Sequence, residues 1–149
     1  MIRTSLIVGL PGEGEEEFRA LCEFLEEVQL ERAGAFVCSP EEGTPAYSME
    51  HCDQEVAQRR QEIVEQIQSR VMDRYNASLV GKTLEVLVDG YDEELEQFFG
   101  RTQGDSPDID GRVYIACQDA LREGQFVNVR IEGSVDGDLT GCLVEEEER

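Results

Sequence analysis

The sequence contains three segments whose residue types could do chemistry, and the first is a glycine-rich loop. Gly9-Leu10-Pro11-Gly12-Glu13-Gly14 joins an apolar run to a segment rich in glutamate. Free backbone amides between a strand and a helix often cradle an anion. The spacing here is G-x-x-G-x-G, no lysine follows, and four glutamates crowd the start of the helix, which disfavours a nucleotide pyrophosphate. The loop is therefore either a ligand-contacting turn or a tight structural turn, and the residues favour both equally.

The second segment is a proline-rich loop with two adjacent carboxylates. Glu41 and Glu42 lie in SPEEGTP, which follows a second apolar run, at the end of a strand where α/β folds place their sites. They could act as acid–base groups, although carboxylates in such loops are more typically solvated. His51 is the only histidine, and a capping or surface role fits it better than catalysis, because no second base or nucleophile lies near it in sequence.

The third segment, residues 100–115, holds charged residues that could contact a partner. Arg101 opens it, and Asp108 and Asp110 flank Ile109 in SPDIDG. The simpler interpretation is a connection between strands in which Asp110 and Gly111 set the turn.

The cysteines provide neither a disulfide framework nor a CxxC metal site. Cys22, Cys38, Cys52, Cys117 and Cys142 are widely spaced, and an odd number of scattered thiols fits a reducing compartment. The first residues lack the features of a signal peptide, and there is no apolar run of about 18 residues. We therefore expect a cytoplasmic protein that does not enter a membrane.

The elements that must position these segments begin with a predicted β-α-β unit. Residues 4–10, TSLIVGL, read as a buried strand, and Phe18, Leu21, Leu25 and Val28 repeat at helical spacing after it. The run AGAFVCS then predicts a second strand, parallel to the first. Two strands and a helix cannot close a barrel or cover both faces of a parallel sheet, so we expect further strands upstream. The alternative is that these elements form a small open α/β layer.

A long helix and an all-β segment follow. Asp53 can cap a helix with apolar residues at Val56, Ile63, Ile67 and Val71, ending near residue 75. Five short strands are predicted at 82–88, 97–102, 112–117, 125–132 and 139–145, with Asp89-Gly90 as a turn. So many short strands in a small domain favour a closed barrel, with a domain boundary near residue 78, giving domains 1–78 and 79–149.

The charge balance indicates which partners the chain can bind. The formal net charge is −21, of which −9 lies in residues 1–75 and −12 in residues 76–149. Such a surface repels phosphate backbones and attracts basic proteins.

Five stretches follow one another along the chain: TSLIVGLPGEGEEEF, AFVCSPEEGTPAY, the long Arg- and Glu-rich helix, LVGKTLEVLVDG and GRTQGDSPDIDGRVYI. Taken in order, they resemble consecutive signatures of the radical-SAM methylthiotransferases, and in particular of the RimO type. The resemblance spans essentially the whole chain, although Gly14 stands where the family's loop commonly has threonine. It implies an α/β segment from the C-terminal end of a radical-SAM barrel, followed by an all-β, five-stranded, OB-like TRAM barrel.

The resemblance also implies cofactors and site residues. Full-length members cleave S-adenosylmethionine to a 5′-deoxyadenosyl radical and hold [4Fe-4S] clusters on cysteine trios, one of them a CxxxCxxC motif. Neither trio is present here, so we expect no cluster, no S-adenosylmethionine and no catalysis on this chain alone. By analogy with the family, the strand ends that contact the adenosine carry Ile7, Val8, Gly9, Phe36, Val37 and Ser39.

The implied substrate is an aspartate of a small-subunit ribosomal protein, which receives a methylthio group. We expect the acidic barrel to dock this basic protein through Asp108, Asp110 and Arg101, and the missing N-terminal part of the enzyme to be the second partner. One alternative is a piece of a tRNA methylthiotransferase, which would need a basic barrel face. A second alternative is an interaction module without catalysis.

Overall fold

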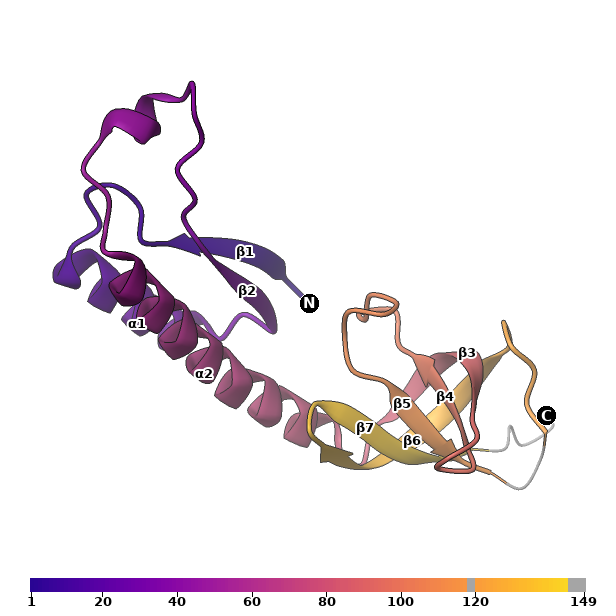
Figure 1. Ribbon diagram of the computed structural model, residues 1–149. Helices are drawn as coiled ribbons and strands as arrows, with labels where there is room; N and C mark the ends of the chain where they lie inside the picture. The colour runs from indigo at the N-terminus through magenta and orange to yellow at the C-terminus, as the bar shows by residue number, and fades with distance from the viewer. Residues whose placement is uncertain (118–119, 145–149) are drawn as a thin grey trace. The chain divides into compact units, whose positions relative to one another are not determined.

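The computed structural model of the chain describes residues 1–117 and 120–144 (Figure 1). It divides into two compact units, residues 1–72 and 73–149. Each unit has its own core, and each is described by itself below.

The first unit contains the β-α-β arrangement that the sequence predicts. Strand β1 (Arg3–Val8) pairs in parallel with β2 (Arg32–Val37), and α1 (Glu15–Val28) connects them. Helix α1 begins after Gly14, whose backbone N–H donates to the Glu17 carboxylate at 2.9 Å. The two strands place Ile7 directly opposite Phe36.

A short 3-10 helix, η1 (Pro45–Ser48), and the long helix α2 (Gln54–Leu79) follow β2. The predicted cap of α2 is confirmed, because the Asp53 carboxylate accepts a hydrogen bond from the backbone N–H of Glu55 at 2.9 Å. The helix ends at Leu79 rather than near residue 75. Among the described residues, no helix is long and apolar enough to cross a bilayer.

The core of the first unit lies between the sheet and the two helices, which cover one face of it (Figure 1). Its buried members are Val8, Phe18, Leu25, Ala35, Val64 and Ile67. The predicted core-facing residues of α1 and α2 are wrong at one position each, because the side chains of Val28 and Val56 are exposed. The opposite face of the sheet stays uncovered within the unit and carries the exposed side chains of Ile7 and Phe36.

The second unit is the predicted five-stranded closed barrel. Its strands are β3 (Thr83–Asp92), β4 (Gln97–Arg101), β5 (Val113–Ala116), β6 (Phe126–Val135) and β7 (Asp138–Leu143). They close in the order β3-β4-β5-β7-β6, and only the β5–β7 pairing is parallel. The predicted last strand extended to Glu145, which lies outside the described residues.

The predicted turn at Asp89-Gly90 is wrong, because β3 runs on to Asp92. A bulge between Val88 and Gly90 interrupts the pairing of β3 with β4, so the glycine marks an irregularity within a strand. The chain reverses after Asp92, whose carboxylate accepts hydrogen bonds from the backbone N–H groups of Glu94 and Leu95, both at 3.0 Å.

The barrel interior is filled by alternate residues of the strands, as the period-two pattern predicts. The fully or nearly fully buried side chains are Val86, Val88, Val113, Ile115, Val129 and Ile131. Gly100 takes an inward position where a methyl group would lie 2.2 Å from the backbone oxygen of Leu87. Closure of so small a barrel therefore depends on a residue without a side chain at this position.

Candidate functional site

The carboxyl ends of β1 and β2 carry most of the residues predicted to contact a cofactor. Ile7 and Phe36 are cross-strand partners on the uncovered face of the sheet, 53% and 58% exposed. Two neighbouring apolar side chains of this kind could form one wall of a site for a planar, apolar group. Ser39 is exposed two residues beyond the end of β2.

The other predicted residues on these strands are turned away from that face. Val8 is fully buried in the core, Val37 packs against the same core, and Gly9 is buried beside α2. Gly9 has a φ of +76°, and a methyl group there would lie 2.6 Å from the Cβ of Ala57. Glycine is therefore required at this strand end both by backbone conformation and by the close approach of α2.

The Gly9–Gly14 loop is held in shape by a buried arginine of α2. The Glu13 carboxylate accepts a hydrogen bond from the backbone N–H of Gly9 at 3.0 Å and a second from Arg60 at 2.8 Å. Arg60 also donates to the Glu13 carbonyl at 2.9 Å and to the Glu15 carboxylate at 3.0 Å. The loop is thus an ordered turn anchored to α2.

The Arg60 side chain is only 6% exposed, and its guanidinium lies 5.2 Å from the centre of the Phe18 ring. Burial works against its charge, but the hydrogen bonds with Glu15 and Glu13 and the charge of Glu13 offset this, so the pKa of Arg60 is raised. The sequence does not identify Arg60 as a buried residue, because its position in a highly charged helix is typical of a solvated side chain.

A hollow of about 590 Å³ lies beside this loop, lined by residues 10–14 and 49–52. His51 belongs to the lining, and one ring nitrogen lies 3.4 Å from the carbonyl oxygen of Tyr47. This contact is local to the loop before α2.

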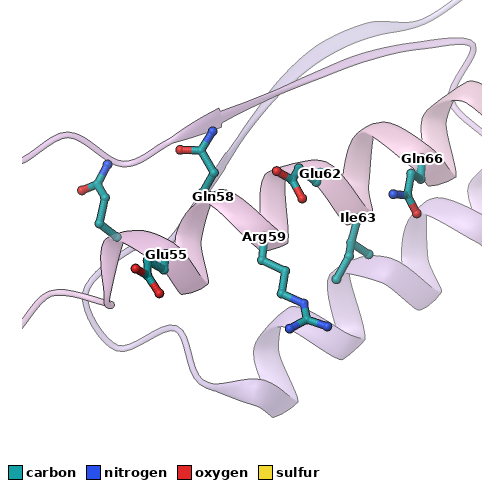
Figure 2. A pocket seen from close by; sticks show the side chains of 7 residues that line it. Glu55, Gln58, Arg59, Glu62, Ile63 and Gln66 are labelled. Atoms are coloured by element: carbon teal, nitrogen blue, oxygen red, sulfur yellow. The ribbon is translucent and has the colours of Figure 1, made fainter.

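A second hollow, of about 720 Å³, runs along the first turns of α2 (Figure 2). Figure 2 shows Gln58 and Glu62 on one side of the helix and Arg59 and Ile63 on the other. Six of the seven lining residues are polar or charged, and none of the seven is among the candidate site residues predicted from the sequence. The strand ends therefore remain the better candidate site in this unit.

In the barrel, the Arg101 side chain contacts another residue of the same unit. Its guanidinium forms an ion pair with Asp89, and both side chains are less than a third exposed. The Arg112 guanidinium lies 4.2 Å from the centre of the Phe99 ring, which also contacts Tyr114 at a centroid distance of 6.4 Å. Arginine and aromatic side chains thus gather on the outer face of β4 and β5.

Asp108 and Asp110 occupy the same loop but have different surroundings. The Asp110 carboxylate accepts a hydrogen bond from the backbone N–H of Ser106 at 2.6 Å, so it holds the loop closed. Asp108 is exposed and has a φ of +59°, a left-handed conformation that aspartate adopts more readily than most residues with a side chain. Of the two, Asp108 presents its carboxylate more openly to a partner.

The part of the chain that the structure describes gathers no group of three or more His, Cys, Asp or Glu side chains that could hold a metal ion. The five cysteines are free thiols.

Comparison with known proteins shows what the barrel and the chain are similar to. A TRAM domain matches residues 80–144, a range that includes all five strands of the closed barrel. Nearly the whole chain aligns with proteins named ribosomal protein uS12 methylthiotransferase RimO. The chain is a homologue of part of the RimO methylthiotransferases. The resemblance inferred from the sequence motifs is therefore confirmed.

Three relatives show the extent of the match. The protein of Clostridioides difficile is 42% identical over 149 residues, covering 98% of this chain and 33% of the relative. The proteins of Myxococcus xanthus and Geobacter sulfurreducens are 47% and 44% identical, and this chain covers 31% and 32% of them. The chain thus spans about a third of the length of the relatives that it matches.

Proposed function

We propose that this chain is the C-terminal part of a radical-SAM methylthiotransferase that adds a methylthio group to an aspartate of the small-subunit ribosomal protein uS12. The observation that carries the proposal is the alignment of nearly the whole chain with RimO proteins at 42–47% identity in these three relatives. The TRAM match supports it, because it coincides with the closed barrel.

The first unit fits the role of the last strands of a larger α/β barrel. Its sheet has only two strands, both helices cover the same face, and the opposite face carries the exposed pair Ile7 and Phe36. Parallel strands are stable when both faces and both edges are covered, so this face fits against the remaining strands of a longer chain. The corresponding partner is the N-terminal part of the same enzyme.

The strand ends fit a contact with S-adenosylmethionine. Ile7 and Phe36 would flank the adenine. Backbone carbonyl groups at Val8, Gly9, Val37 and Ser39 would accept hydrogen bonds beside it, because the Gly9 N–H already donates to Glu13. When bound together with a [4Fe-4S] cluster, this cofactor supplies the radical chemistry of the family. The residues of this chain would bind and orient the adenosine, whereas the cluster ligands would come from the rest of the protein.

The barrel would recognise the protein substrate by charge. Residues 76–149 carry a net charge of −12, which complements a basic ribosomal protein and opposes a nucleic-acid backbone. Asp108 is placed for such a contact, while Asp110 and Arg101 would act mainly by shaping the surface around it.

A specific observation favours a second candidate, a tRNA methylthiotransferase. Arg112, Phe99 and Tyr114 lie on the outer face of β4 and β5, and OB-like barrels bind nucleic acids on faces with such residues. Against it, Arg101 on the same face is neutralised by Asp89. The net charge of the barrel makes the protein substrate the better candidate.

A chimaeric enzyme tests the proposal. This chain would replace the aligned third of the Clostridioides difficile relative, and the modification of uS12 and of tRNA would be measured by mass spectrometry. We expect methylthiolated uS12 and unmodified tRNA. Modification of tRNA instead of uS12 would contradict the proposal, and the unaltered relative serves as the control for activity.

A further inference from the structure

Two segments far apart in sequence form one surface at one end of the barrel. They are the β4–β5 loop, residues 102–112, and the β6–β7 turn with the strand residue on either side of it, residues 135–138. The backbone N–H of Arg112 donates to the Asp138 carboxylate at 2.7 Å, and the Leu139 N–H donates to the Arg112 carbonyl at 2.8 Å. A methyl group on Gly111 would lie 2.2 Å from the carbonyl oxygen of Gly137. The two segments are therefore packed directly against each other.

A buried side chain of α2 stabilises this surface. Asn76 is 3% exposed, and its side-chain amide donates to the Gly137 carbonyl at 3.2 Å. Within the loop, the Asp105 carboxylate accepts hydrogen bonds from the N–H and the hydroxyl of Thr102 at 3.1 and 2.6 Å. The surface thus has a defined shape before any partner binds, which lowers the ordering entropy of association.

Each segment exposes a large aliphatic side chain at this end. Ile109 is 76% exposed, the highest value among the large hydrophobic residues described, and Val135 is 62% exposed. Isolated exposed apolar residues are ordinary, but here two stand on two segments that are fixed to one another. Fixed, exposed aliphatic groups are suited to insert into a partner.

Both aliphatic residues have aspartates as neighbours in sequence. Asp108 and Asp110 flank Ile109 in sequence, and Asp136 and Asp138 follow Val135. The nearest base in sequence is Arg112, whose guanidinium lies over the Phe99 ring. The surface therefore combines apolar groups with strong negative charge, which complements a segment rich in lysine and arginine.

We infer that the surface formed by Ile109, Val135, Asp108, Asp110, Asp136 and Asp138 is where the barrel docks its basic protein partner, with the two aliphatic side chains as anchors. The occupant is a Lys- and Arg-rich protein segment that carries an apolar side chain between its basic residues. This inference rests on the proposed function, but it assigns the binding affinity to two aliphatic side chains and not to charge alone. Binding depends on Ile109 and Val135, while the aspartates direct the approach and set its salt dependence.

The test uses the full 149-residue chain and purified uS12 as the probe. Ile109→Ser with Val135→Ser should weaken binding at least about tenfold, the usual effect of truncating an anchor residue. The matched control is Leu95→Ser, which removes an aliphatic side chain that is 55% exposed in the acidic β3–β4 turn. It should leave the affinity unchanged. All three side chains are exposed, so the thermal melts of the variants should match that of the unaltered chain.

The outcomes separate this inference from the proposed function. If the unaltered chain does not bind uS12, the proposed function fails and the inference falls with it. If it binds and the double variant binds equally well, or if Leu95→Ser weakens binding as much, the surface is wrongly placed although the proposed function stands. As a second measure, Asp108→Asn with Asp136→Asn should reduce the loss of affinity with rising salt, and an unchanged salt dependence would also overturn the inference.

Discussion

Replacing Arg60 with methionine tests how strongly α2 holds the loop at the end of β1. Methionine keeps much of the apolar stem but removes the guanidinium, which contacts the Glu13 carboxylate, the Glu13 carbonyl and the Glu15 carboxylate. The Glu13 side chain is 11% exposed and would keep the hydrogen bond from the Gly9 N–H. Breaking a buried ion pair by removing one partner costs about 3–5 kcal/mol.

We expect the lower end of that range, because two features reduce the loss. Glu15 is 87% exposed, so its pair contributes little, and Glu13 can reach some water once the guanidinium is gone. A loss of about 3 kcal/mol would speed hydrogen exchange of the β1 and α1 amides roughly hundredfold where exchange requires opening of the unit. Hydrogen exchange followed by mass spectrometry measures this change in rate directly.

Two further variants complete the design. Glu13→Gln in the Arg60→Met background removes the orphaned charge, so the double variant should be more stable than the sum of the single losses implies, by at least about 1 kcal/mol. Arg70→Met is the control, because Arg70 and Glu26 form an ion pair in which both side chains are 57% exposed, and its loss should be under about 0.5 kcal/mol. Equal effects of Arg60→Met and Arg70→Met would refute the reasoning.

Three other predictions concern the barrel, a thiol and metal binding. Gly100→Ala should destabilise the barrel by several kcal/mol, because the methyl group meets backbone at 2.2 Å, whereas Gly133→Ala, whose nearest contact is a hydroxyl at 3.2 Å, should have a small effect in a urea melt. Burial and the charge of Glu26 raise the pKa of Cys22, so Glu26→Gln should speed its alkylation at pH 8, and an unchanged rate would argue against the charge effect. Anaerobic reconstitution should load no iron–sulfur cluster onto this chain, and stoichiometric iron with visible absorption near about 400 nm would disprove that.

The layout of the fold could be predicted because its signals are local. The run TSLIVGL, the helical repeat of Phe18 and Leu25, and the alternation of Val127, Val129 and Ile131 each report the period of one element. The closed barrel followed from the number and shortness of the strands. The prediction of a turn at Asp89-Gly90 was wrong because glycine is typical both of β-bulges and of hairpin turns, and the local sequence does not distinguish the two.

The details of the sites depend on contacts between distant segments, which no local pattern contains. Arg60 is buried only because the Gly9–Gly14 loop folds over it, 47 residues away from Glu13 in sequence. Asp110 holds its own loop, and the start of β7 at Asp138 lies against that loop only because β5 and β7 pair in parallel. Sequence reasoning therefore found the segment around Asp108 but could not identify Ile109 as its most exposed apolar group.

The most direct test of the central claim is a calorimetric titration of the chain with uS12 and, separately, with tRNA in about 150 mM salt. We predict that uS12 binds with an affinity that falls as the salt concentration rises, and that tRNA shows no binding, because the barrel carries a net charge of −12. Binding of tRNA without binding of uS12 would contradict the account and would favour a tRNA methylthiotransferase.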